Sequence, residues 1–172
     1  LFLFSFALEK YFDKKVTTVV NNSYELARDY VDEVRNKIES EIILIAFDTN
    51  KSKKFLNDNV NEYRKFLNTQ KIIRGVDEIH IMDEDKKLIF STLDDDQLYI
   101  PPVDKALNLV LKDDRPLKII NAPENRSAAI MRLQNFDNRF LYVVKYLDEN
   151  ISKYLNETQE AINFYYTVEE QS

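Results

Sequence analysis

Apolar positions recur at helical spacing through the first 48 residues, and no proline or glycine interrupts them. This pattern predicts one helix over residues 1–48, about 70 Å long at about 1.5 Å of rise per residue. Such a helix is far longer than the roughly 11-residue average of globular proteins. We therefore expect it to cross a membrane, to pair with a copy of itself, or to carry a signal between compartments.

The apolar pattern divides this helix into three parts. Residues 1–11 begin with side chains that are apolar on every side, which is typical of a membrane helix where it leaves the bilayer. Residues 38–47 form a broad apolar face that suits a helix covering a sheet. Between them, a strict four-three spacing predicts the seam of a helix pair, and thus a homodimer, through Val16, Val20, Ser23, Ala27, Tyr30 and Val34. The alternative for both later parts is packing within the monomer.

The rest of the chain predicts a sheet with helices around it. A second helix is expected over residues 52–74, capped by Ser52 and ended by Gly75. Period-two patterns then predict five strands between residues 76 and 146, at 78–82, 87–92, 117–121, 126–134 and 139–146, with a short helix at 103–111. A final helix is expected over 149–168. Because strands joined by short turns are usually antiparallel neighbours, we predict an α+β fold with one five-stranded antiparallel sheet.

Composition excludes several classes of function. The chain carries 30 acidic against 24 basic residues, a net charge of −6, which argues against nucleic-acid binding. It has no cysteine, so disulfides and thiolate metal sites are excluded, and its single glycine excludes phosphate-binding loops and nucleophile elbows. No catalytic constellation can be assembled from the scattered carboxylates. We therefore expect neither enzymatic activity nor a cofactor.

Two basic residues on strands are candidates for holding an anionic ligand. Arg132 shares one face of its strand with Ala128 and Ile130, and a guanidinium on a half-apolar face can hold a carboxylate through two hydrogen bonds. Lys145 lies on the next strand. Solubilising surface charge is the alternative for both. The single histidine, His80, lacks the partners of a transition-metal site, and we consider it as a ligand contact or as a structural residue.

The order of elements resembles the PAS-like extracytoplasmic sensory folds called PDC or Cache domains. Four stretches narrow the resemblance to the sensor segment of NtrY-type nitrogen-regulation histidine kinases, over about residues 12–170. They are Asn22-Ser23 with Ala27 and Tyr30, then Ala46-x-Asp48, then Phe66-Leu67-x-x-Gln70, and Leu133-Gln134-Asn135-Phe136-Asp137 with Leu141-Tyr142-Val143. The last of these is the most distinctive.

The resemblance implies a dimeric, membrane-bound two-component sensor in the inner membrane, with this domain on the periplasmic side. Residues 1–11 and 169–172 would then adjoin two membrane helices, and 12–168 would form one single-Cache sensor domain. In PDC domains a small ligand lies under the loops after the second strand, a region that here includes Ser91 and Tyr99. Nothing matches the phosphoacceptor or ATP motifs of kinases, so kinase chemistry is expected elsewhere in the polypeptide. The alternatives are a ligand-free structural or dimerisation domain and the Cache domain of a chemoreceptor.

Overall fold

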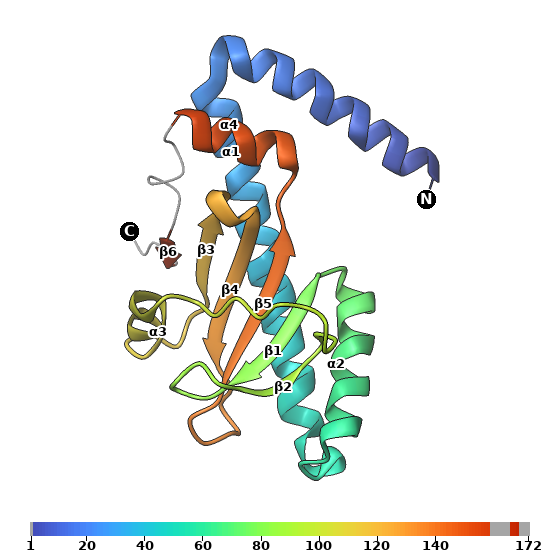
Figure 1. Cartoon of the computed structure of the whole chain (residues 1–172), viewed down its shortest axis with the longest axis vertical. Coiled ribbons are helices and arrows are strands. Elements are labelled where there is room, and N and C mark those ends of the chain that lie inside the picture. Colours follow the sequence, from blue (N-terminus) through green and yellow to red (C-terminus); the bar gives the residue numbers. More distant parts are fainter. Residues whose placement is uncertain (1, 159–165, 169–172) are drawn as a thin grey trace.

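Helices surround one antiparallel sheet in the structure, a computed structural model that describes the backbone of residues 2–158 and 166–168 and side-chain burial over residues 25–157 (Figure 1). The elements are α1 (Phe2–Leu56), α2 (Val60–Arg74), β1 (Glu78–Met82), β2 (Leu88–Ser91), α3 (Asp104–Val110), β3 (Leu117–Asn121), the 3-10 turn η1 (Ala122–Glu124), β4 (Arg126–Arg132), β5 (Phe140–Tyr146), α4 (Glu149–Thr158) and β6 (Tyr166–Val168).

The sheet confirms the predicted α+β class and all five predicted strands. Its order is β2-β1-β5-β4-β3-β6, and every neighbouring pair is antiparallel. β6 is an addition to the prediction, because residues 166–168 pair with β3 instead of ending a helix. The final helix predicted over 149–168 is confirmed as far as Thr158 and is wrong at 166–168, and residues 159–165 lie outside the described part. Two tyrosines, a threonine and a valine at 165–168 favour strand over helix.

The first helix is longer than predicted, because α1 continues through residues 48–50 to Leu56. The hydroxyl of Thr49 donates to the carbonyl of Ile45 (2.7 Å), so this polar residue is satisfied inside the helix. The predicted Ser52 cap is wrong. Asn59 caps α2 instead, and its side-chain oxygen accepts the Glu62 N–H (3.0 Å).

The lower half of α1 covers one face of the sheet together with α2, and in Figure 1 it passes behind the strands. Ile38, Ile42, Ile45 and Ala46 are buried there, as predicted. Ile43, Leu44 and Phe47 are 46%, 43% and 61% exposed, so the predicted face was too broad. A helix lying on a sheet presents only one side to it, which leaves these residues facing outward.

The upper part of α1 packs against α4 within the same chain. Ala27 and Tyr30 are buried against residues of α4 and η1, among them Ile151, Leu155 and Ala122. The Tyr30 hydroxyl accepts the N–H of Asp148 (2.9 Å). The predicted dimer seam is therefore corrected at Ala27 and Tyr30, where packing within the monomer holds, and half-buried Val34 packs against the same cluster. The side chains of Val16, Val20 and Ser23 lie outside the described residues.

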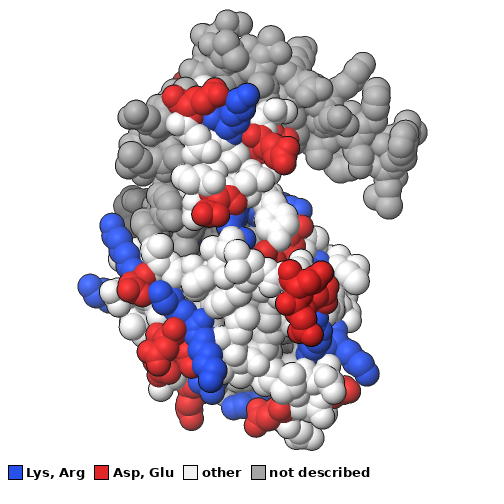
Figure 2. Space-filling view, in the orientation of Figure 1, with Lys and Arg blue, Asp and Glu red and all other residues white. Residues whose placement is uncertain are grey.

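The other face of the sheet is covered by α3 and by the yellow-green segment of residues 92–103, which crosses in front of the strands in Figure 1. Figure 2 shows charged side chains of both signs on this side, around a central area that lacks them. In residues 2–158 and 166–168, no helix has the length and apolarity needed to cross a membrane. The membrane contacts expected for residues 1–11 stay a prediction, and residues 169–172 lie outside the described part.

Candidate functional site

A cluster of polar side chains is buried on the sheet face beneath the 92–103 segment. Alternation along β1 turns Glu78 and His80 to this face, and Ser91 of β2, Arg126 of β4 and Tyr146 of β5 reach them from the neighbouring strands. Glu78, His80 and Arg126 are 3%, 0% and 6% exposed. Buried charged groups require partners, and these residues supply them to one another.

The His80 ring is fully satisfied as a neutral imidazole. Its Nε2 lies 2.9 Å from Glu78 Oε1 and its Nδ1 lies 2.8 Å from Ser91 Oγ. The carboxylate can only accept, so we assign the proton to Nε2, and Nδ1 then accepts from the Ser91 hydroxyl. Ser91 Oγ in turn accepts the Leu93 N–H (3.0 Å). Burial lowers the pKa of His80 below its ordinary 6.5 although Glu78 opposes the effect, so the ring is neutral at pH 7.

Glu78 is the centre of the cluster. Besides His80, its carboxylate accepts from Arg126 Nη2 (3.1 Å) and from the Tyr146 hydroxyl (2.5 Å). Burial alone would raise the pKa of this carboxyl, but the hydrogen bonds from His80 and Tyr146 and the charge of Arg126 outweigh burial and lower the pKa to about 2. Glu78 is therefore ionised and balances the buried guanidinium.

Two openings meet at Arg126. A hollow of about 390 Å³ lies on one side of it, lined by Glu78, Leu93, Gln97, Leu98, Glu124, Asn125, Arg126 and Tyr146. A cavity of about 30 Å³, the size of one water, lies on the other side against Tyr142 and residues 100–103. The covering segment is fixed to the sheet because the Tyr142 hydroxyl donates to the Ile100 carbonyl (3.0 Å). The hollow therefore has a charged, preformed floor and a wall made by one crossing segment.

The structure brings together three of the predicted site residues. His80 bonds Ser91, and the ring of Tyr99 lies 5.4 Å from the His80 ring, centroid to centroid. The Tyr99 hydroxyl donates to the Lys86 carbonyl (2.7 Å). The polar groups of all three are thus occupied within the protein, beside the hollow and not inside it.

Arg132 and Lys145 are not brought together, because they lie on opposite faces of the sheet. Arg132 Nη2 donates to the Leu111 carbonyl near the end of α3 (3.3 Å). Lys145 faces α1. Glu78, Arg126 and Tyr146 were missed by sequence reasoning, although charged residues inside strands that are otherwise apolar could have indicated them. Glu78 alternates with the apolar Ile79 and Ile81, and Arg126 belongs to the same alternating set as Arg132.

Comparison with known proteins shows the family to which the chain belongs. A family model described as the NtrY N-terminal region matches residues 1–172. The chain belongs to this family. It is 23% identical over 164 residues to the nitrogen regulation protein NtrY of Azorhizobium caulinodans, which covers 95% of this chain and 21% of the relative. Putative sensor histidine kinases described as NtrY-like, from Rickettsia felis and Rickettsia typhi, are 22% identical over 167 residues, covering 94% of this chain and 27% of each relative. The chain thus spans between 21% and 27% of these relatives.

Three of the four stretches by which the chain resembles NtrY-type sensors lie at the end of α1 that contacts α2, and they attach α1 to the domain. Asp48 on α1 accepts hydrogen bonds from Gln70 (3.1 Å) and Arg74 (3.0 Å) on α2. At the other end of α2, the ring of Phe136 lies edge-on to Tyr63, with 6.5 Å between centroids. These residues hold α1, α2 and the β4–β5 turn together, so in this NtrY N-terminal region they have a structural role.

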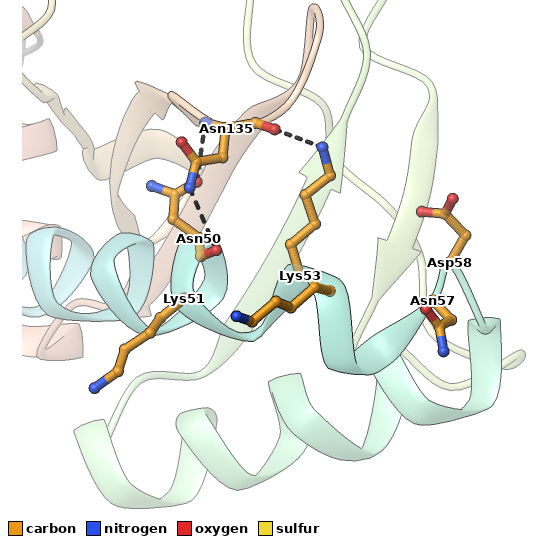
Figure 3. Close-up of a pocket in the computed structure, with 7 residues that line it drawn as sticks. Asn50, Lys51, Lys53, Asn57, Asp58 and Asn135 are labelled. Atoms are coloured by element: carbon orange, nitrogen blue, oxygen red, sulfur yellow. Dashed lines mark hydrogen bonds between the residues drawn. The ribbon is translucent and has the colours of Figure 1, made fainter.

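A hollow of about 600 Å³, larger than the Arg126 hollow, lies at this fastened end of the NtrY N-terminal region (Figure 3). The Asn135 N–H donates to Asn50 Oδ1 (3.2 Å), and Lys53 Nζ donates to the Asn135 carbonyl (2.6 Å). Figure 3 shows Lys51 and Asp58 pointing away from this pair, so the polar groups diverge. We therefore place the candidate ligand site at the Arg126 hollow.

Proposed function

We propose that this chain is the extracytoplasmic sensor domain of a membrane-bound, NtrY-type sensor histidine kinase. The observation that carries the proposal is the buried Glu78–Arg126 pair at the floor of the hollow under residues 92–103. This charged floor lies on the sheet face opposite the one that α1 covers. A molecule bound in the hollow would therefore contact the same strands that hold α1.

The hollow suits a small polar ligand. Gln97 and Glu124 are exposed at its wall, and Asn125 Oδ1 is a buried acceptor without a hydrogen-bond partner in the described part of the chain. Because the exposed carboxylate of Glu124 is an accessible acceptor at the wall, the hollow favours a ligand that brings an N–H or O–H donor. We propose that such a ligand bridges the 92–103 segment and the start of β4.

The signal would travel through α1 and the C-terminal part of the domain. α1 is joined to the sheet by an ion pair between the buried Lys118 and the half-buried Glu39 (3.4 Å), and to α4 through the packing of Tyr30. Because of these attachments, we propose that α1 either moves together with the domain or exchanges one set of contacts for another. A ligand shifts this balance only by the difference in its affinity for the two arrangements.

Membrane attachment, a periplasmic location and a homodimer remain parts of the proposal. The apolar start of the chain supports a membrane helix that ends near residue 11. The four-three spacing supports pairing through Val16, Val20 and Ser23, without Ala27 and Tyr30.

A full-length test uses the polypeptide that contains this chain, reconstituted in vesicles, with autophosphorylation as the readout. Gln97→Ala and Asn125→Ala change the hollow at residues that are not fully buried, and Asn108→Ala on the exposed side of α3 is the matched control. We expect the two hollow variants to change the autophosphorylation rate at least about threefold while the control leaves it unchanged. A kinase that is indifferent to both variants, or a polypeptide with no kinase core, would refute the proposal.

A ligand-free structural domain is the second candidate. It is favoured by the observation that Glu78 and His80 are already fully hydrogen-bonded within the protein. A thermal-shift screen of amino acids, amines and carboxylates separates the two functions, because a ligand that binds only the folded state raises the melting temperature in a saturable way. If no compound in the screen raises the melting temperature, the structural role is favoured.

A further inference from the structure

A second cavity, of about 90 Å³, lies on the opposite face of the sheet from the Arg126 hollow. It lies between α1, the turn after α2 and the end of β5, and it is partly open to solvent. Its lining residues are Tyr30, Val34, Lys37, Ile38, Glu41, Gly75, Val76, Lys145 and Tyr146. The cavity therefore separates α1 from the sheet at one point along a helix that is otherwise tightly attached.

The end of α2 creates this space. Gly75 adopts a left-handed conformation (φ +67°) as the C-cap of α2, and its N–H donates to the Lys71 carbonyl (3.0 Å). Outside α2 and the two residues that flank Gly75, no heavy atom of the described residues lies within 4 Å of the position that a Cβ on Gly75 would occupy. Val34, Ile38 and Val76 form apolar walls around the remaining volume.

The charges at the cavity leave one ammonium group without a counterion. Lys37 Nζ lies 3.4 Å from Glu41, so these two rim residues balance each other. Lys145 is half-buried, and no carboxylate in the described part of the chain forms an ion pair with it. An unpaired cation beside an apolar cavity favours a ligand with an apolar body and a single negative charge.

We propose that this cavity binds a short aliphatic monocarboxylate of three or four carbons, whose tail enters the cavity and whose carboxylate accepts a hydrogen bond from Lys145. The size follows from the volume. Water occupies about 30 Å³ in the liquid, and a cavity of about 150 Å³ accommodates benzene. A volume of 90 Å³ holds about three water-sized groups and excludes larger rings. This site shares only Tyr146 with the Arg126 hollow, and it does not depend on the proposed sensory function.

A bound tail would contact α1 directly at Val34 and Ile38 while its carboxylate is held by β5. Occupancy would thus add a connection between α1 and the sheet where the empty protein has none. The expected result is tighter attachment of α1, which would oppose any movement of this helix away from β5.

The single glycine provides a specific probe of the cavity. The chain labelled with ¹⁵N-glycine gives one amide resonance, from Gly75, because no other glycine exists. Propionate and butyrate should shift this resonance with saturation, whereas propionamide, a neutral analogue of the same size, should not shift it at equal concentration. Chloride at the same ionic strength is the control for a general salt effect.

Two variants test the contacts. Lys145→Gln removes the positive charge but keeps a polar, slightly shorter side chain, and it should weaken propionate binding about tenfold or more, since charged hydrogen bonds are the stronger class. Val34→Phe fills the cavity and should abolish the shift. Lys87→Gln, at an exposed lysine beside β2, is the matched control and should bind as the parent does. Circular dichroism checks that each variant is folded.

The outcomes distinguish this proposal from the sensory one. A saturable shift with propionate that Lys145→Gln weakens supports the site, whatever the kinase assay gives. An equal response to propionamide, a shift that rises linearly without saturation, or unchanged affinity in Lys145→Gln overturns it. An unchanged autophosphorylation rate in Gln97→Ala and Asn125→Ala would instead count against the Arg126 hollow as a ligand site.

Discussion

Replacing Glu78 with glutamine tests whether the buried polar cluster stabilises the domain. The substitution keeps the size of the side chain but removes the charge that balances Arg126, which is 6% exposed. It also leaves the donors of His80 and Tyr146 competing for one amide oxygen. A buried guanidinium without a counterion is costly, because the low-polarity surroundings cannot replace water.

Two independent routes give a similar magnitude. Removing one partner of a buried ion pair typically costs about 3–5 kcal/mol. The pKa of Glu78 falls from its ordinary 4.5 to about 2, and each pKa unit corresponds to about 1.4 kcal/mol, so the ionised carboxylate contributes about 3 kcal/mol at pH 7. We therefore expect Glu78→Gln to lower the free energy of unfolding by about 3 kcal/mol at pH 7.

The pH dependence gives a second signature. A carboxyl whose pKa is lowered in the folded state contributes fully above its unfolded pKa, and its contribution is lost as pH falls from about 4.5 toward about 2. The difference in the free energy of unfolding between the parent and Glu78→Gln should therefore be about 3 kcal/mol at pH 7 and decrease to about 2 kcal/mol at pH 3.5. A destabilisation caused only by altered packing would not change with pH in this way.

Urea unfolding followed by circular dichroism at several pH values measures both quantities. Glu84→Gln, at an exposed residue of the β1–β2 turn, is the matched control and should change stability by less than about 0.5 kcal/mol. Should Glu78→Gln not fold, Tyr146→Phe removes a single donor to the same carboxylate and should cost about 1 kcal/mol. If Glu78→Gln lowers the free energy of unfolding by less than about 1 kcal/mol, or lowers it equally at pH 7 and pH 3.5, the ionised carboxylate does not stabilise the domain as proposed.

Three further changes can be checked by the same unfolding assay. Burial lowers the pKa of His80, so the free energy of unfolding of the parent should fall as pH falls below about 6.5. His80→Gln should lack this loss of stability. If the variant keeps the same pH dependence, groups other than His80 cause the loss. Gly75→Ala should lower the free energy of unfolding by about 1 kcal/mol, because alanine disfavours the left-handed backbone conformation, and Gly75→Asn should lower it less. Equal stability of the parent and the two variants would contradict a left-handed conformation at Gly75. Tyr30→Phe should lower the free energy of unfolding by about 1 kcal/mol, because the N–H of Asp148 loses its acceptor. Unchanged stability would show that water replaces the Tyr30 hydroxyl as the acceptor.

The strands and their faces could be predicted from the sequence because the evidence is local, whereas the place of β5 between β1 and β4 could not. Period-two alternation and short polar turns specify antiparallel neighbours, and all five predicted strands form. The end of α1 could not be predicted in this way. Asp48, Thr49 and Asn50 are poor helix formers, but the structure gives them partners on α2, on the preceding turn of α1 and on the β4–β5 turn.

Spacing along one helix indicates that a face is covered but not what covers it. The four-three pattern correctly marked Ala27 and Tyr30 as contact positions, yet their partner is α4 of the same chain. The site shows the same limit. His80 and Ser91 could be named from the sequence and the resemblance, whereas pairing Glu78 with Arg126 requires knowing that β5 lies between β1 and β4.

The short strand β6 has a consequence for solubility. A sheet edge exposes unpaired N–H and C=O groups, and such an edge can recruit another chain and begin aggregation. β3 would be such an edge, with the apolar Leu117 and Ile119 in it, but residues 166–168 pair with it and leave only three residues at that border. The opposite border, β2, is only four residues long. A chain cut after residue 158 would uncover β3, so aggregation, and not only lost stability, is the expected outcome of that truncation.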